Sequence, residues 1–190
     1  MPKNIVLCGV GGQGTVLASK LLAMAAMEAD IPVMSAETIG MAQRGGSVFS
    51  HVRIGEGIHS PMIARNSADL IIGFEPGETV RMLPYLKDGG QVVTSTRAIK
   101  PVTATLSESA YEKEPMIDYL KKNVVNLTLI DAEKACSEIG STKVLNMVLL
   151  GSALRTGALD FQTEDIERVM CQTLPEKFHD INLKALNYTK

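Results

Sequence analysis

The sequence predicts an α/β fold, specifically a three-layer α/β/α domain with a mostly parallel sheet, an antiparallel element and a helical C-terminus. An apolar run, residues 4–9, precedes a glycine-rich turn, and the apolar residues of 18–29 then recur at helical spacing. Strand-like and helix-like segments alternate until about residue 131, after which helical patterns continue to the end. No repeat, low-complexity tract or linker divides the 190 residues. We therefore expect a single domain, residues 1–190.

The N-terminal elements are expected to form a β-α-β unit. Residues 4–9 and 32–37 are typical of strands, and strands that flank a crossover helix run parallel. A polar, glycine-bearing loop follows at 38–46. Residues 47–54 then alternate apolar and polar side chains, which predicts the first arm of a hairpin that turns at 55–57.

The rest of the chain continues the alternation. Buried strands are predicted at 68–74, 91–96 and 127–131. A helix is predicted at 76–86, with Pro76 in its first turn, and Gly89-Gly90 form a turn before the next strand. The C-terminal helices are expected at 132–139, 144–155, 164–174 and from 176 onward. The second of these is apolar nearly all round, which indicates a buried helix.

Composition excludes several classes of function. A net charge of −2 and an aromatic content of 4%, without Trp, argue against a nucleic-acid ligand. The three cysteines are far apart, so neither a disulfide framework nor an iron–sulfur cluster held by this chain is expected. No spacing of histidines or cysteines is typical of a metal site. The chain shows no signal-peptide pattern and no apolar run long enough for a bilayer, so we expect a cytoplasmic protein with no membrane partner.

The first candidate site is the glycine loop after the first strand. Its glycines fit G-x-G-x-x-G between a strand and a helix, where backbone N–H groups and a helix N-terminus can hold an anion. Glu37 lies 23 positions after Gly14, close to the spacing of the ribose-binding acid in dinucleotide folds, although no second mononucleotide half follows. Alternatively, the glycines only permit close packing of strand on helix. The candidate ligand or interface residues are Gly9, Gly11, Gly12, Gln13, Gly14 and Glu37.

The second candidate site is the loop around Arg44. A guanidinium beside bare glycine N–H groups suits a carboxylate or a phosphate, whereas the alternative is an arginine that fastens the loop to its own domain. Ser47 lacks the closing glycine of a nucleophile elbow, so no hydrolase triad is predicted. No catalytic residue can be named. The candidate residues here are Gln43, Arg44, Gly45, Gly46 and Ser47.

Together these motifs resemble the gamma-type subunit or domain of the 2-oxoacid:ferredoxin oxidoreductases, and within that family the indolepyruvate-type beta subunits most of all. The resemblance covers most of the chain, thinning between about 102 and 126 and after 156. It is carried by GVGGQG at 9–14, EtiGMAQRGGSVfSHVRiG at 37–55, SPMI at 60–63, EP…E…R…LPYLKDGG at 75–90 and KVLNMVLLG at 143–151.

The resemblance implies a subunit of a complex that oxidatively decarboxylates an aryl-2-oxoacid such as indolepyruvate, using coenzyme A and passing electrons to ferredoxin. Thiamine diphosphate and the iron–sulfur clusters would belong to a larger catalytic partner subunit. This chain would support assembly and present the glycine loop and Arg44 near coenzyme A or substrate, and alone it would be inactive. The alternatives are a gamma subunit for another 2-oxoacid (pyruvate or 2-oxoglutarate), a freestanding Rossmann-type nucleotide-binding protein, or an assembly module without chemistry.

Overall fold

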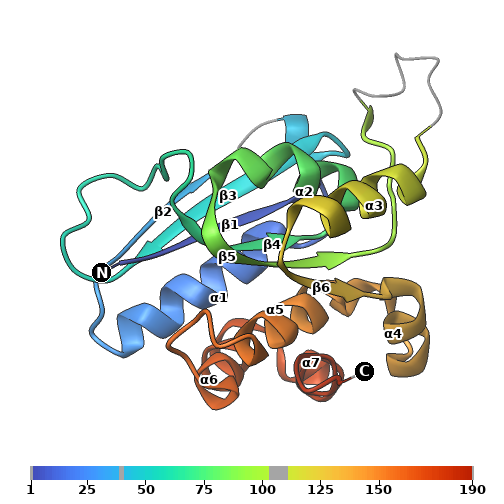
Figure 1. Ribbon diagram of the computed structural model, residues 1–190. Helices are drawn as coiled ribbons and strands as arrows, with labels where there is room; N and C mark the ends of the chain where they lie inside the picture. Colours follow the sequence, from blue (N-terminus) through green and yellow to red (C-terminus); the bar gives the residue numbers. More distant parts are fainter. Residues whose placement is uncertain (1, 39–40, 103–110, 190) are drawn as a thin grey trace.

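The computed structural model describes residues 2–38, 41–102 and 111–189. Within this part of the chain, six strands form one sheet in the order β2-β3-β1-β4-β5-β6, with helices on both faces (Figure 1). The predicted three-layer architecture is therefore confirmed. The strands are β1 Lys3–Val10, β2 Val33–Glu37, β3 Ser47–Ile54, β4 Ala68–Gly73, β5 Leu86–Ser95 and β6 Asn126–Ile130.

Most of the sheet is parallel. β4 pairs in parallel with β1 and β5, and β5 pairs in parallel with β6. The carboxyl ends of these four strands therefore meet at one edge of the sheet, which we call the carboxyl edge. In open α/β sheets, ligands bind outside this edge.

The antiparallel element is β3, which lies between β1 and β2 and runs antiparallel to both. β1 and β2 run in the same direction, as predicted, but they are not neighbours. The predicted hairpin turn at 55–57 is wrong, because β3 pairs with β2 before it, and residues 55–67 form a loop that leads to β4. Alternating side chains identified β3 as a strand, but alternation does not specify which strands it pairs with.

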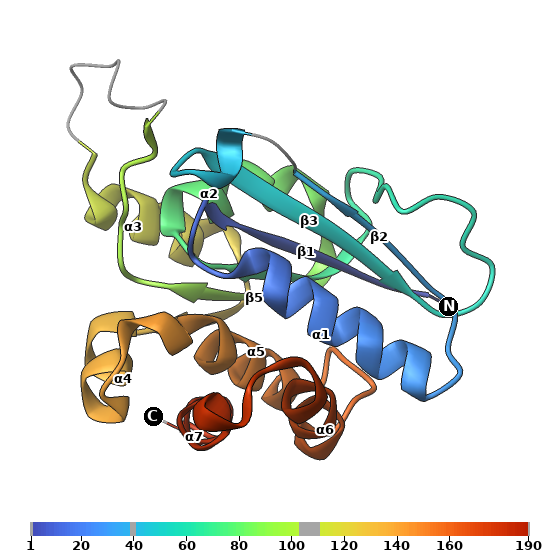
Figure 2. The same ribbon diagram turned by 180° about the vertical axis from the view of Figure 1, so that it is seen from behind.

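Helices cover the sheet unequally. Figures 1 and 2 show two helices on one face, α2 (Pro76–Met82) and α3 (Lys113–Asn123). The other face carries α1 (Thr15–Glu28), α4 (Ala132–Ile139), α5 (Leu145–Arg155), α6 (Thr163–Thr173) and α7 (His179–Leu186). Short 3-10 helices lie at Met41–Gln43, Leu83–Tyr85, Thr142–Val144 and Glu176–Phe178.

The two faces have separate apolar cores. On β1, Ile5 and Leu7 join the core under α1 and α5, whereas Val6 and Cys8 join the core under α2 and α3. This alternation follows from the period of two along a strand, and burial on both faces is typical of parallel sheets. α5 is buried from Leu145 to Leu154, as its apolar sequence predicts.

Several boundaries differ from the predicted ones. β5 begins at Leu86, so the glycine pair at 89–90 lies within the strand as an irregularity in its register with β4 and not before it. α2 ends at Met82 and continues as a 3-10 turn. The sequence pattern did not predict α3. None of the described helices is both long and apolar enough to cross a membrane.

Candidate functional site

The glycine loop follows β1 at the carboxyl edge and leads into α1. Gly12 and Gly14 have φ angles of 101° and 90°, which glycine adopts without strain, and Gly14 is the N-cap of α1. Gly9 has no positive φ, but a Cβ there would lie 2.7 Å from Cβ of Phe74. The glycines therefore serve both the turn and the close packing of the loop.

Gln13 fastens the glycine loop to the sheet. Its Oε1 accepts a hydrogen bond from the N–H of Val10 at 2.7 Å, and its Nε2 donates to the carbonyl of Phe74 at 2.9 Å. Both ends of the amide are thus engaged within the chain. Gln13 holds the loop at the end of β1 and β4, and does not extend from it.

The Arg44 loop, residues 41–46, packs directly on the glycine loop. The N–H of Gly11 donates to the carbonyl of Gly46 at 2.8 Å. A Cβ on Gly11 would overlap the backbone of Ala42 and Gln43. The structure therefore brings together two motifs separated by about 30 residues in the sequence, and the second glycine of the motif contacts this chain's own backbone.

A third segment covers the Arg44 loop. Gly45, with a φ of 82°, accepts a hydrogen bond at its carbonyl from the N–H of Val102 at 2.9 Å. Gln43 donates from Nε2 to the carbonyl of Thr38 at 3.1 Å, which ties the loop to the end of β2. Arg44 is exposed, and its guanidinium forms no ion pair within the ranges that the structure describes.

Glu37 does not lie beside the glycine loop. It ends β2, which β3 separates from β1, and its Oε1 accepts a hydrogen bond from the hydroxyl of Ser19 on α1 at 2.5 Å. Dinucleotide folds place this acid on the strand adjacent to β1, and they leave the second glycine open for the pyrophosphate. Neither condition holds here. The alternative of a Rossmann-type dinucleotide site is therefore wrong in its geometry.

A cavity of about 330 Å³ lies between the two loops and the first turn of α1. Backbone of the glycine loop and the apolar side chains of Val16 and Val48 form much of its wall. It is lined by Gly11, Gly12, Gly14, Thr15, Val16, Gln43 and Val48. Four of the predicted candidates, Gly11, Gly12, Gly14 and Gln43, thus share one opening with a helix N-terminus, a position that favours negative charge.

Asn146, which sequence reasoning missed, borders the same loop. It lies in the first turn of α5, is 3% exposed, and its Oδ1 has no hydrogen-bond partner within the described chain. A Cβ on Gly14 would lie 3.0 Å from its Nδ2. The motif at 143–151 contained this residue, but only the fold places it against the glycine loop.

A second group that the sequence analysis missed is a pair of buried glutamates on α2. Glu75 and Glu78 are both fully buried, and Ser47 at the start of β3 donates from its hydroxyl to Oε2 of Glu78 at 2.5 Å. Burial raises the pKa of Glu75, although hydrogen bonds from the Glu78 N–H and the Tyr111 hydroxyl oppose the rise. In the sequence, the motif at 75–90 contains both glutamates and could have pointed to them.

Cys8 faces these glutamates from β1. It is fully buried, and burial, reinforced by the charge of Glu78, raises the pKa of its thiol. A thiol of this kind stays protonated and is a poor nucleophile. Within the described ranges, no group of three His, Cys, Asp or Glu side chains could hold a metal ion.

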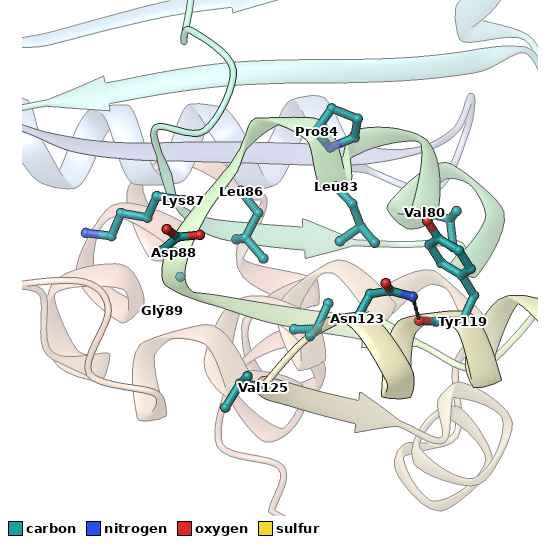
Figure 3. Close-up of a pocket in the computed structure, with 12 residues that line it drawn as sticks. Val80, Leu83, Pro84, Leu86, Lys87, Asp88, Gly89, Tyr119, Asn123 and Val125 are labelled. Atoms are coloured by element: carbon teal, nitrogen blue, oxygen red, sulfur yellow. Dashed lines mark hydrogen bonds between the residues drawn. The ribbon is translucent and has the colours of Figure 1, made fainter.

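A separate groove of about 430 Å³ lies between α2, α3 and the start of β5. Figure 3 shows Leu83 and Leu86 on one side of it and Val125, which is 96% exposed, on the other. None of the candidate residues from the two loops lines this groove. The candidate residues of the two loops and this groove therefore lie in different places on the molecule.

Comparison with known proteins identifies the family of this chain. The family model described as pyruvate ferredoxin/flavodoxin oxidoreductase matches residues 4–189. A Thermococcus kodakarensis protein named indolepyruvate oxidoreductase subunit IorB is 39% identical over 187 residues, which cover 96% of this chain and 91% of that protein. A pyruvate/ketoisovalerate oxidoreductases common subunit gamma from the same organism is 27% identical over 179 residues, with coverage of 93% and 89%.

A solved structure shares the fold. The keto/oxoacid ferredoxin oxidoreductase gamma subunit from Geobacter sulfurreducens superposes with a TM-score of 0.71 at 24% identity, covering 98% of this chain and 93% of that one. The family model and the 39% identical relative confirm the resemblance seen in the motifs. This chain belongs to the pyruvate ferredoxin/flavodoxin oxidoreductase family, as a subunit of a 2-oxoacid:ferredoxin oxidoreductase.

Proposed function

We propose that this chain is the small subunit of an indolepyruvate-type 2-oxoacid:ferredoxin oxidoreductase of the cytoplasm. The observation that carries the proposal is the difference in identity between the two kinds of relative, 39% to the indolepyruvate subunit against 27% to the pyruvate/ketoisovalerate subunit. The subunit would take part in converting an aryl-2-oxoacid and coenzyme A to an acyl-CoA and carbon dioxide, with the two electrons passed to ferredoxin.

In this proposal the larger partner subunit holds the redox groups. The three free cysteines, Cys8, Cys136 and Cys171, are far apart in sequence, and the described residues offer no cluster of metal ligands. Such a ligand set does not suit an iron–sulfur cluster. Thiamine diphosphate, which supplies the carbanion chemistry of decarboxylation, is assigned to the same partner.

We assign to this chain the positioning of coenzyme A or of the substrate that approaches it. The cavity at the glycine loop combines a helix N-terminus with bare backbone, and Arg44 follows Gln43 at its wall. Arg44 is exposed and forms no ion pair within the described chain, so its guanidinium is free to bind a phosphate or carboxylate in two-point contact.

The substrate assignment is tested on the complex reconstituted anaerobically with the larger subunit. Reduction of ferredoxin that depends on coenzyme A should be fastest with indolepyruvate, and each subunit alone should be inactive. A higher kcat/KM with pyruvate or 2-oxoglutarate would contradict the indolepyruvate assignment. Turnover by this chain alone would contradict its place as a subunit without a catalytic centre.

The positioning role is tested with Arg44→Ala. Loss of a charge-assisted bidentate contact should raise the KM for coenzyme A by about tenfold or more, because hydrogen bonds to charged groups contribute about 1.5–3 kcal/mol. Arg65→Ala, at an exposed position in the loop before β4, is the matched control and should leave that KM unchanged. An unchanged KM in Arg44→Ala would remove Arg44 from the binding site.

A further inference from the structure

The buried glutamates of α2 hold two segments that meet at the Arg44 loop. Glu78 contacts the residue that follows that loop, because Ser47 at the start of β3 donates from its hydroxyl to Oε2 of Glu78 at 2.5 Å. Glu75 contacts residues 97–102, which we call the covering segment, because its Oε1 accepts from the N–H of Ile99 at 3.4 Å. Its Oε2 also accepts from the hydroxyl of Tyr111 at 2.9 Å, where the described chain resumes after residue 110. The two carboxylates stand one helical turn apart.

Several features show that α2 is shaped for these contacts. Glu75 is the N-cap of α2 and accepts at Oε2 from the N–H of Glu78 at 2.9 Å. Gly77 lacks the Cβ that would overlap the hydroxyl of Tyr111, so the tyrosine can reach Glu75. Arg81, 61% exposed, approaches Oε2 of Glu78 with its Nε at 3.4 Å.

The arrangement is costly for the fold. Oε1 of Glu78 is buried and has no partner among the described residues. A buried carboxylate oxygen without a donor destabilises the folded state, and an uncharged glutamine of the same shape would avoid much of that cost. Local violations of this kind are expected where a residue serves function and not stability.

We propose that Glu75 and Glu78 are positioning residues for the proposed coenzyme A site. Glu78 fixes the start of β3, and with it Gly46, whose carbonyl accepts from the N–H of Gly11. Glu75 fixes, through the N–H of Ile99, the covering segment that donates from Val102 to the carbonyl of Gly45. Together they fix the position of the Arg44 loop relative to the glycine loop. This inference rests on the proposed function for its effect on binding, but not for its effect on the loop.

The experiment measures hydrogen exchange and kinetics on the complex with the larger subunit. Ser47→Ala removes the donor to Glu78, and Glu78→Gln exchanges a charged acceptor for a neutral one. Both should speed the exchange of the amides of Gly11 and Gly46, about tenfold in Ser47→Ala and less in Glu78→Gln. Glu164→Gln, in the exposed first turn of α6, is the control and should change nothing.

The thermal unfolding midpoint separates a positioning role from a merely structural one. In Glu78→Gln the midpoint should stay equal or rise, because a buried charge is removed, while the loop amides lose protection. If Glu78 has only a structural role, the unfolding midpoint and the protection of the loop amides should both fall in Glu78→Gln. In the double variant, which combines Ser47→Ala with Glu78→Gln, the loop amides should exchange no faster than in Ser47→Ala alone, since both changes remove the same contact.

Tyr111→Phe tests the contact through Glu75. It removes one of the donors that hold the Glu75 carboxylate, whose other oxygen accepts from Ile99. It should therefore speed the exchange of the Val102 amide and leave the amide of Val93 in the centre of β5 unchanged. Unchanged exchange of the loop amides in Ser47→Ala and of Val102 in Tyr111→Phe would overturn the proposal. Faster exchange with an unchanged KM for coenzyme A would support the positioning role and contradict the loop's part in coenzyme A binding, so the two failures are distinguishable.

Discussion

At the glycine loop, each glycine meets a different physical requirement. Gly12 and Gly14 need a positive φ, Gly9 needs room for Phe74, and Gly11 needs room for the Arg44 loop. The motif G-x-G-x-x-G is consistent with all of these needs and with an open phosphate site. Only the fold distinguishes them, because the contacts of Gly9 and Gly11 come from residues distant in the sequence.

Gly11→Ala tests the contact between the two loops. The new methyl group would overlap backbone that cannot move freely, so the free energy of unfolding should fall by about 1–3 kcal/mol. Urea denaturation of the purified chain measures the change. Gly12→Ala meets open space and only a dihedral penalty, so its loss should be smaller. An equal loss in both variants would contradict a steric role for Gly11.

His51 makes stability depend on pH. It is fully buried, its Nδ1 accepts from the N–H of Ile63 at 3.0 Å, and burial lowers its pKa from the usual 6.5. Since the unfolded state binds the proton more readily, the free energy of unfolding should fall as the pH drops below about 6.5. His51→Asn keeps an acceptor but cannot titrate, so the difference in unfolding free energy between it and the native chain should shrink on acidification.

The control for this experiment is His59→Asn, at an exposed position in the loop after β3. It should retain the native pH dependence. Glu75 has the opposite effect on pH dependence, because its raised pKa gives stability that is lost as the pH rises. This contribution is the same in both variants and in the native chain, so it does not affect the comparison. A pH profile of His51→Asn parallel to the native one would show that His51 does not contribute.

The sequence predicts the candidate residues of the two loops but not the residues that they contact. Gly9 to Gly14 and Gln43 to Ser47 were identified as candidates from local spacing, and the structure brings these two loops together. The contact of Gln13 with Phe74 spans 61 residues, and that of Ser47 with Glu78 spans 31. No local pattern carries such information, so the buried glutamates and Asn146 could not be assigned roles in advance.

Among the elements, the strands and the C-terminal helices were largely predictable, whereas their neighbours in the sheet were not. α4 begins and ends at the predicted residues, since Asp131 caps it and Gly140 ends it in the left-handed conformation. β3 was recognised as a strand but placed with the wrong partner. α3 escaped detection because its exposed surface carries many charged residues and only Ile117 and Leu120 are buried.

The packing of α5 on α7 gives a prediction at this scale. Gly151 on α5 faces the carbonyl of Leu186, which also accepts from the guanidinium of Arg155 at 3.2 Å. Alanine is normally the better helix residue by about 1 kcal/mol, yet in Gly151→Ala the methyl would overlap that carbonyl. The free energy of unfolding should therefore fall by about 1–3 kcal/mol. Ser137→Ala on the exposed side of α4 is the control, and a stabilised Gly151→Ala would refute the close contact.

Over the whole molecule, the two candidate loops and the loop at 55–67 lie at opposite edges of the sheet. The glycine loop and the Arg44 loop lie at the carboxyl edge, where Gly9 and Val10 pair with Val48 and Ser47. The loop at 55–67 lies at the opposite edge, because Ile54 pairs with Lys3. Figure 2 shows this loop beside the N-terminus, with the first turn of α1 at the other end of β1. Changes at one edge should therefore leave the other intact.

An insertion tests this separation. A short Gly-Ser segment between Glu56 and Gly57, both exposed, should leave the unfolding midpoint and the KM for coenzyme A of the complex unchanged. The same segment between Gly45 and Gly46 should abolish protection of the Gly11 amide and raise that KM. A rise in KM with the first insertion would show that the two edges are coupled.

The place of β3 also orders the events of synthesis on the ribosome. A nascent chain that has released its first 46 residues carries β1, α1 and β2, but the strand that must lie between the two strands has not yet emerged. The β-α-β unit therefore cannot close by itself as a folded intermediate. Residues up to 54 must leave the exit tunnel before the N-terminal third of this chain can form its sheet.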